Sequence, residues 1–150
     1  MRGLVPGGAC QRPAKSDYDG SKAVDGDPAT YWATEDGTKE ASIEVELDGS
    51  RPFDRVVLSE PIALGQRVRR FRLSVPAGPA TSGNHRDWRT IAEGTTVGHR
   101  RIVRVPLTNA RRVRVEVLDA RACPLISHVG VHRTVPDAAG AWPPSTSDAR

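Results

Sequence analysis

Long apolar runs and cysteines are scarce in this chain. No run approaches the roughly 18 apolar residues of a membrane-spanning helix, and residues 1–10 lack the apolar centre of a secretory signal. The two cysteines, Cys10 and Cys123, are too few for a cysteine-bound metal cluster. They can form at most one disulfide, which would require the Gly- and Pro-rich lead to fold back, so we expect two thiols instead. The composition thus argues against a membrane span and a cysteine-bound metal.

Catalytic motifs are missing as well. The chain has no G-x-S-x-G elbow, no H-E-x-x-H pair and no glycine-rich phosphate loop. Its four histidines are scattered without metal-ligand spacing, at His85, His99, His128 and His132. A glycosidase needs two carboxyl groups about 5 to 10 Å apart around the scissile bond, whereas the acids here are expected on turns and exposed strand faces. We therefore expect no catalysis by this chain.

Basic residues outnumber acidic ones, 22 to 18, and the net charge is +4. Such a balance raises the question of a nucleic-acid partner. The arginines, however, alternate with apolar residues: in RRFRLSV, Arg70 and Arg72 alternate with Phe71 and Leu73, and RRVRVEV repeats the pattern. This alternation is typical of half-buried strands with charged outer faces. We therefore interpret the arginines as solvated strand faces and expect no nucleic-acid partner.

Alternating residues predict a series of short strands and almost no helix. The predicted strands cover residues 41–49, 53–60, 69–75, 88–94, 99–107, 111–119 and 126–133. Turn-rich segments separate them, such as the Pro- and Gly-rich loop 76–87. This pattern predicts an all-β fold, an antiparallel sandwich. The expected organisation is an irregular lead over 1–15, one β-sandwich domain over 16–133 and a disordered tail over 134–150.

The segment AVDGDPATYWAT, residues 23–34, predicts a tight loop because its glycine and proline resist regular helix and strand. The carboxylates of Asp25 and Asp27 and the hydroxyl of Thr30 are oxygen donors that suit a calcium ion. The alternative is a metal-free turn in which the aspartates accept backbone N–H hydrogen bonds. Composition alone favours that metal-free turn. Trp32, which follows directly, is expected in the core.

Two sets of motifs carry a family resemblance. SDYDGSKAVDGDPATYWAT, followed by an alternating strand, resembles the start of coagulation factor 5/8 type C, or discoidin, domains, which include the family 32 carbohydrate-binding modules. PIALGQRVRRF, DWRTIAEGTTVGHRRIVRVP and RRVRVEVLDARACPLISHVGVHR are similar to the C-terminal β-sandwich of bacterial α-L-fucosidases of glycoside hydrolase family 29. The resemblance covers about residues 16–133. It implies a galactose-binding-domain-like jelly roll of eight strands with a sugar site in the loops at one end.

The resemblance also implies a structural calcium ion. Its ligands here would be the carbonyl of Lys22 with Asp25, Asp27 and Thr30. The family completes this site with a glutamate after a serine, whereas in this chain Ser127 is followed by His128. Imidazole is a poor calcium ligand, so this departure puts the ion in doubt. In a second departure, residues 1–15 lack the alternation of the family's first strand, and we expect that strand to be missing or remodelled.

For the sugar site, the resemblance points to the ALGQR and DARAC loops and the TEDG turn. The expected hydrogen-bond donors are Gln66, Arg67 and Arg121, and the expected acceptors are Glu60 and Asp36. Tyr31 or Tyr18 would supply a stacking ring, although aromatic residues make up only 5% of the chain, which favours weak binding. An alternative for Arg121 is an ion pair with Asp119 that fixes the loop.

These observations predict a non-catalytic carbohydrate-binding or accessory domain of an α-L-fucosidase-like glycosidase, recognising terminal fucose or galactose. One alternative is a structural domain that docks against a glycosidase barrel and binds no sugar. Another is electrostatic binding to anionic polymers or membranes through the arginine-rich strands. The family resemblance implies an extracellular or periplasmic location.

Overall fold

The computed structural model describes residues 2–4, 19–35, 37–77 and 87–134, and this part of the chain is all-β. The strands are β1 (Arg2–Leu4), β2 (Trp32–Ala33), β3 (Ala41–Ser59), β4 (Val68–Pro76), β5 (Trp88–Thr95), β6 (Arg101–Ala120), β7 (Leu125–Ile126) and β8 (His128–His132). Two short 3-10 helices, η1 (Gly20–Ala23) and η2 (Ile62–Leu64), interrupt them. None of the described helices has the length and apolar character that a membrane crossing requires.

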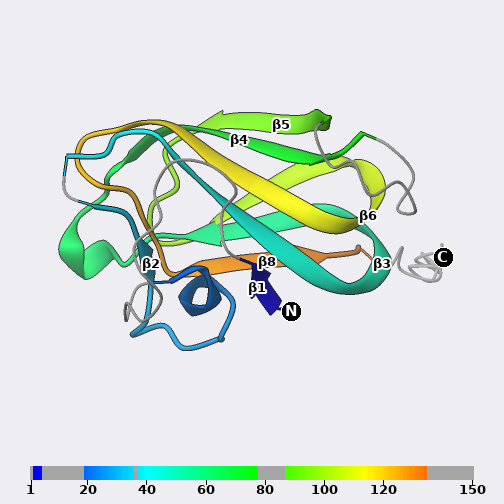
Figure 1. Ribbon diagram of the computed structural model, residues 1–150, viewed down its shortest axis with the longest axis horizontal. Coiled ribbons are helices and arrows are strands. Elements are labelled where there is room, and N and C mark those ends of the chain that lie inside the picture. The colour runs from blue at the N-terminus through cyan, green and yellow to red at the C-terminus, as the bar shows by residue number, and fades with distance from the viewer. Residues whose placement is uncertain (1, 5–18, 36, 78–86, 135–150) are drawn as a thin grey trace, which may run out of the picture.

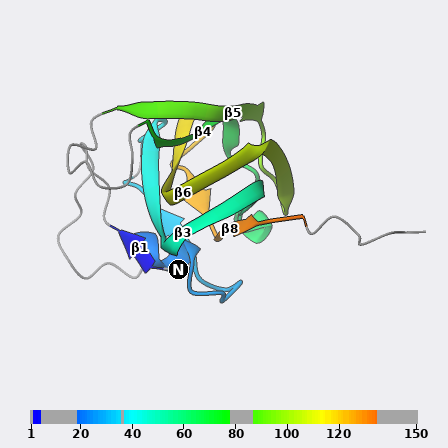
Figure 2. The same ribbon diagram turned by 90° about the vertical axis from the view of Figure 1, so that its right-hand side faces the viewer.

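One sheet folds back on itself to make the two layers of a sandwich (Figures 1 and 2). Its strand order is β1-β3-β6-β4-β5 with β8 paired to β3, and β2 and β7 form a separate antiparallel pair. β3 and β6 belong to both layers: residues 41–46 of β3 pair with 112–117 of β6, and residues 51–58 pair with 101–110. The register breaks between Glu46 and Arg51, where Gly49 takes a φ of 77°. A glycine suits this bend because residues with a side chain rarely adopt a positive φ.

We name the layers by their outer strands. The β4 layer consists of β1, β4, β5 and the halves of β3 and β6 that pair over 41–46 and 112–117. The β8 layer consists of β8 and the other halves of β3 and β6. Each layer turns alternate side chains toward one shared core, as the period-two pattern requires. The core includes Ile43 and Val113 from the β4 layer and Leu58 and Val129 from the β8 layer.

The structure confirms the antiparallel sandwich and the burial of Trp32, which is 4% exposed. Two expectations about strand ends change. The predicted strands 41–49 and 53–60 run on into one another as β3, and 99–107 and 111–119 run on as β6. In both cases the strand bends at the register break, and pairing resumes beyond it in a shifted register, as β-bulges allow.

The expectation of an irregular lead without a strand was wrong for three residues. Arg2–Leu4 forms β1, which pairs antiparallel with Glu44–Glu46 of β3. An edge strand is held by backbone N–H and C=O groups, so it can form without a side-chain pattern. The rest of the lead, with Cys10 and Tyr18, and the tail from 135 lie outside the described residues, so the disulfide and tail predictions stay predictions.

Gly94 provides a test of core packing between β4 and β5. It faces Phe71 across the ladder, and a Cβ at Gly94 would lie 2.6 Å from Cζ of that ring. Phe71 is 1% exposed, so the ring has little room to move. We expect Gly94→Ala to lower the free energy of unfolding by about 1–3 kcal/mol, measured by urea denaturation. The neighbouring, exposed Thr95→Ala serves as control and should cost clearly less; equal losses would contradict the packing argument.

Candidate functional site

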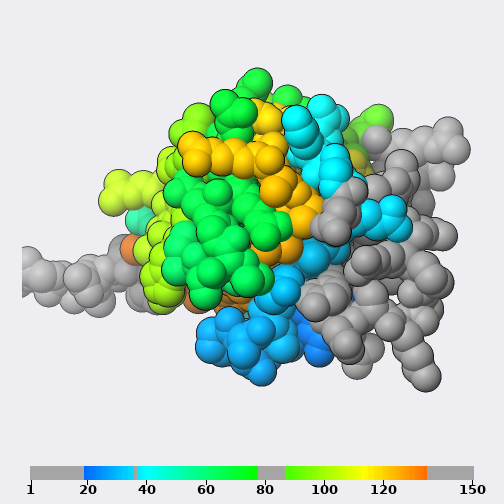
Figure 3. Space-filling model, turned by 90° about the vertical axis from the view of Figure 1, so that its left-hand side faces the viewer, coloured from blue at the N-terminus to red at the C-terminus, as the bar shows by residue number. Residues whose placement is uncertain are grey.

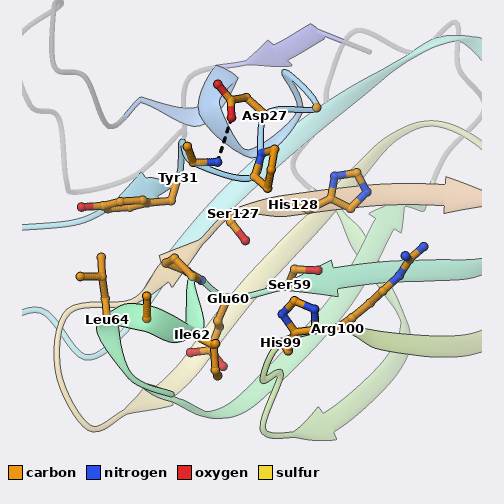
Figure 4. Close-up of a pocket in the computed structure, with 15 residues that line it drawn as sticks. Asp27, Tyr31, Ser59, Glu60, Ile62, Leu64, His99, Arg100, Ser127 and His128 are labelled. Atoms are coloured by element: carbon orange, nitrogen blue, oxygen red, sulfur yellow. Dashed lines mark hydrogen bonds between the residues drawn. The ribbon is translucent and has the colours of Figure 1, made fainter.

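Loops from four parts of the chain meet at one end of the sandwich and enclose a cleft of about 600 Å³. In Figure 3 the green residues around η2 and the blue residues of the loop before β2 gather at this end. Pro28, Ala29 and Tyr31 of the loop before β2 line the cleft together with Ile62 and Leu64 of η2. These side chains give the cleft an apolar wall, with Tyr31 and Leu64 on the same side of it (Figure 4).

Polar groups line the opposite side of the cleft. His128 and Ser127 come from the start of β8, and His99 and Arg100 come from the connection that enters β6. Burial, then the charge of Arg100, then that of His132 lower the pKa of His128 below its usual value. His128 is therefore mostly neutral near pH 7, and its imidazole can both donate and accept a hydrogen bond. The cleft thus opposes an apolar surface with several hydrogen-bonding side chains.

A buried carboxylate holds the loops around this cleft. Glu60 is 2% exposed. Its Oε1 accepts the N–H groups of Arg67 and Val68 at 2.8 and 2.9 Å, and its Oε2 accepts the N–H of Gly98 at 2.7 Å. Its own N–H donates to the carbonyl of Gly98 at 2.8 Å. One side chain therefore ties the η2 loop to the connection that carries His99 and Arg100.

Arg67 supplies a second tie on the far side of the η2 loop. Its Nη1 donates to the carbonyl oxygen of Cys123 at 3.2 Å and to its Sγ at 2.9 Å. Its Nη2 donates to the carbonyl of Leu64 at 3.4 Å, and its own carbonyl accepts the N–H of Arg121 at 2.8 Å. The guanidinium and backbone of Arg67 thus join the ALGQR and DARAC loops.

Most of the predicted sugar-binding residues are grouped by the structure, but outside the cleft lining. Glu60, Arg67 and Arg121 share the network just described, and Gln66 and Arg121 are exposed beside it. Asp36 lies outside the described residues. Asp119 pairs with Arg69, Nε to Oδ2 at 3.5 Å, rather than with Arg121 as the alternative had it. Of the sequence candidates, Glu60 and Tyr31 line the cleft.

Sequence reasoning missed the polar side of the cleft. His99, Arg100 and His128 are far apart in the chain and follow no motif. They meet because the residue before β6 and the first residue of β8 flank the same end of β3, where Ser59 pairs with His128. A strand-register prediction for β3, β6 and β8 is the signal that would have found them.

The loop of the implied calcium site is closed by its own hydrogen bonds. Thr30 Oγ1 lies 2.7 Å from Asp25 Oδ2, 3.1 Å from the carbonyl oxygen of Asp27 and 3.4 Å from that of Lys22. Asp25 Oδ1 accepts the N–H of Asp27. Asp27 Oδ1 accepts the N–H of Ala29, the dashed line in Figure 4. The Thr30 hydroxyl, followed by the Asp27 N–H, lowers the pKa of Asp25.

This donor set does not by itself fit calcium. Lys22, Asp25, Asp27 and Thr30 bring together four oxygens, with one carboxylate among them, whereas calcium takes six to eight. His128 offers nitrogen where the family has a carboxylate. Within the described ranges no group of three or more His, Cys, Asp or Glu residues is arranged to hold a metal. Of the two interpretations these contacts favour the metal-free turn, and the calcium ion that the resemblance implies stays untested.

Comparison with known proteins identifies the family. The family model described as "NedA-like, galactose-binding domain" matches residues 22–115. The chain belongs to this family. Its members' fold agrees with the sandwich described above, and the resemblance to factor 5/8 type C domains is confirmed.

The relatives of this galactose-binding domain include glycosidases. Alpha-L-fucosidase 1 of Arabidopsis thaliana is 33% identical over 103 residues, which are 68% of this chain and 19% of that protein. A GH29 fucosidase of Ruminococcus gnavus, solved with fucose, has a TM-score of 0.67 and 30% identity over 81% of this chain and 23% of that one. The chain spans less than a fifth of the plant fucosidases it matches.

A separate binding module shares the fold. The Clostridium perfringens module CpGH89CBM32-5, solved with GalNAc-β-1,3-galactose, has a TM-score of 0.66 and covers 81% of this chain and 89% of its own. At 21% identity it shows the fold alone.

The Glu60 network makes a prediction about stability. Glu60→Gln keeps the size but points an NH₂ group at backbone N–H donors, which leaves buried donors unsatisfied. We expect a loss of about 2–3 kcal/mol in the free energy of unfolding, measured by urea denaturation. Glu93→Gln removes an exposed carboxylate that pairs with Arg72 at 2.7 Å, and it should cost less than about 1 kcal/mol. Similar costs for the two variants would refute a special role for Glu60.

The calcium loop makes a second prediction. Because hydrogen bonds close the loop without an ion, we expect the melting temperature to be the same in excess calcium and in EDTA. The check is differential scanning fluorimetry of the wild type and of Asp25→Asn. A calcium-dependent rise in the wild type that Asp25→Asn loses would show instead that the family's ion binds here.

Proposed function

We propose that this galactose-binding-like domain is a carbohydrate-binding module that holds a terminal sugar of the fucose or galactose type in the cleft. One observation carries the proposal: the cleft of about 600 Å³ at the loop end sets an apolar wall against hydrogen-bonding side chains. This volume lies within the range of small-molecule sites, about 300 to 1,000 Å³. Sugars present an apolar face and ordered hydroxyls, so they match such a pair of surfaces.

In this proposal the two sides of the cleft have different tasks. Tyr31, with Ile62 and Leu64, packs against the apolar face of the ring. His128 and Arg100 exchange hydrogen bonds with its hydroxyls, since a neutral imidazole and a guanidinium fix orientation. Gln66 and Arg121, exposed beside the η2 loop, remain candidates for contacts with the next sugar. The Glu60 bonds keep η2 in place, which reduces the entropy lost on binding.

The domain acts here by binding and not by catalysis. Its cleft is lined by two carboxylates, Asp27 and Glu60, among the residues that the structure describes. Both oxygens of Glu60 accept buried backbone N–H groups, so Glu60 is not placed to donate or accept a substrate proton. Glycosidic cleavage needs a cooperating acid pair. Linkage to a fucosidase catalytic domain, and a location outside the cytoplasm, belong to this proposal through the relatives.

Binding should depend on the ring of Tyr31. We expect the chain to bind terminal fucose or galactose on a glycan array, and the best ligand to bind weakly in calorimetry. Tyr31→Ala should weaken that binding about tenfold, because the sugar loses an apolar surface worth roughly 1–2 kcal/mol. Tyr31→Phe should retain it.

Trp88→Ala is the matched control, because Trp88 lies on β5 outside the cleft, where Arg114 stacks 3.8 Å from its ring centroid. It should leave sugar binding unchanged. A chain that binds no glycan, or that binds equally well without Tyr31, would contradict the proposal. The docking role would then be the better explanation, and the exposed Ile102 and Leu107 would be the first surface to test against a catalytic domain.

A further inference from the structure

The outward face of the β8 layer carries cations in a regular arrangement. Val56, Leu58, Val103 and Val129 are core residues or pack against the core, so their neighbours along each strand face away from it. The strand register then sets two rows across the layer: His132, Arg55 and Arg104 form one, and Gly130, Val57 and Ile102 form the next. Ser59 pairs with His128 in a third row, at the end where Arg100 enters β6. We call Arg55, Arg100 and Arg104, together with the imidazoles of His128 and His132, the cationic strip; its positive charge is that of the three arginines.

The middle row of the strip has no charged side chain. Gly130 has no side chain, and the Nε2 atoms of His128 and His132 lie 2.8 and 3.3 Å from the position that its Cβ would occupy. Both imidazoles therefore lean over Gly130 from either side. Val57 is 2% exposed and Ile102 is 59% exposed. Gly130 and Val57 are thus buried beneath the neighbouring side chains, and Ile102 is the exposed apolar residue between the two rows of positive or ionisable groups.

The two outer faces of the sandwich differ in how their charge is balanced. On the β4 layer three arginines meet carboxylates: Arg72 with Glu93, Arg112 with Glu46 and Arg114 with Glu44. On the strip, Arg55 meets Asp54 at 3.3 Å, and this aspartate also accepts the N–H of Thr134. For Arg100 and Arg104 the described part of the chain provides no carboxylate within ion-pair distance. The charges of Arg100 and Arg104 are thus not balanced by an ion pair with a described carboxylate.

The strip continues into the cleft. His128, Ser59 and Arg100 line the cleft and also form the end row of the strip. A ligand longer than one sugar can therefore leave the cleft across the β8 layer without crossing a loop. Strands lie about 4.8 Å apart, and the row of Arg55 and Arg104 lies about 14 Å from the row of His128 and Arg100, because the uncharged middle row separates them. A chain with anionic groups on successive sugars can contact both rows.

We propose that the cationic strip binds an acidic polysaccharide, a glycan carrying sulfate or carboxylate groups, of which one sugar occupies the cleft. Placing one sugar of this glycan in the cleft rests on the proposed function. Binding of its anionic groups depends only on the residues of the strip. A polysaccharide fits better than a nucleic acid because the strip has no Trp, Tyr or Phe ring, the large side chains on which successive bases stack. The arginine-rich strands 69–75 and 111–119 are the weaker candidate surface, since Arg72, Arg112 and Arg114 there each meet a carboxylate.

The test compares a sulfated galactan with the same polymer after chemical desulfation, using the complete 150-residue chain and affinity electrophoresis at several salt concentrations. We expect the sulfated form to bind more tightly, with a steep loss as salt rises. Arg104→Glu, outside the cleft, should weaken binding of the sulfated form about tenfold. It should leave the desulfated form and simple sugars unaffected. Arg104→Lys should retain binding.

Arg70→Glu is the matched control, because Arg70 is an exposed arginine of the β4 layer and its reversal changes the net charge equally. It should change sulfated-polymer binding less than about twofold. Equal weakening by both reversals, no preference for the sulfated polymer, or equally tight Arg104-dependent binding of single-stranded DNA would each overturn the strip as a polysaccharide site. Simple-sugar binding that needs Tyr31, without any effect of Arg104→Glu, would overturn this inference and leave the proposed function standing. Arg104-dependent binding of the sulfated polymer without simple-sugar binding would support the strip and contradict the proposed function of the cleft.

Discussion

The buried carboxylate of Glu60 is the constraint on which the loop end depends. Three backbone N–H groups from two segments converge on it, and its own backbone returns a bond to Gly98. Each of these groups would be costly to bury without a partner. The network fixes η2 against the entry to β6, so the apolar wall and the polar side of the cleft keep their separation. The geometry of the cleft is therefore set by a residue that the sugar need not touch.

The bend in β3 and β6 has a second consequence, because it gives one polypeptide two unlike outer faces. Residues 41–46 and 112–117 lie side by side in the β4 layer, where acidic and basic residues alternate and meet as cross-strand pairs. Beyond the bend the same two strands bring Arg55 beside Arg104. Like charges so placed are unfavourable unless solvent or a partner screens them. This face continues into the cleft, so an anionic ligand that extends from the cleft would screen the repulsion between the two arginines.

The sequence predicted much of the fold but less of the candidate site. Strict alternation in residues 41–47 and 111–117 predicted strands with one buried face, and the motifs from SDYDG to the last strand predicted the family. Glu60 was predicted as a hydrogen-bond acceptor for the sugar, whereas both of its carboxylate oxygens accept backbone N–H groups. Its burial was not visible, because backbone partners leave no sequence pattern. For the loop of Asp25, Asp27 and Thr30 the sequence left two alternatives, a calcium site and a metal-free turn. The hydrogen bonds of the loop are those of the metal-free turn. The strand at Arg2–Leu4 escaped notice for a similar reason, since an edge ladder is made by the backbone.

The sequence by itself determined which residues face inward and which outward, because a period of two assigns every strand residue to one side. It also determined that catalytic motifs are lacking and that positive charge is in excess. Only the tertiary structure decided which outward charges are neutralised. Register across β3, β6 and β8 places Arg104 against Arg55, and register across β3 and β6 elsewhere places Arg114 against Glu44. Pairing between residues distant in the chain depends on that register, and a shift of one position would exchange the two faces.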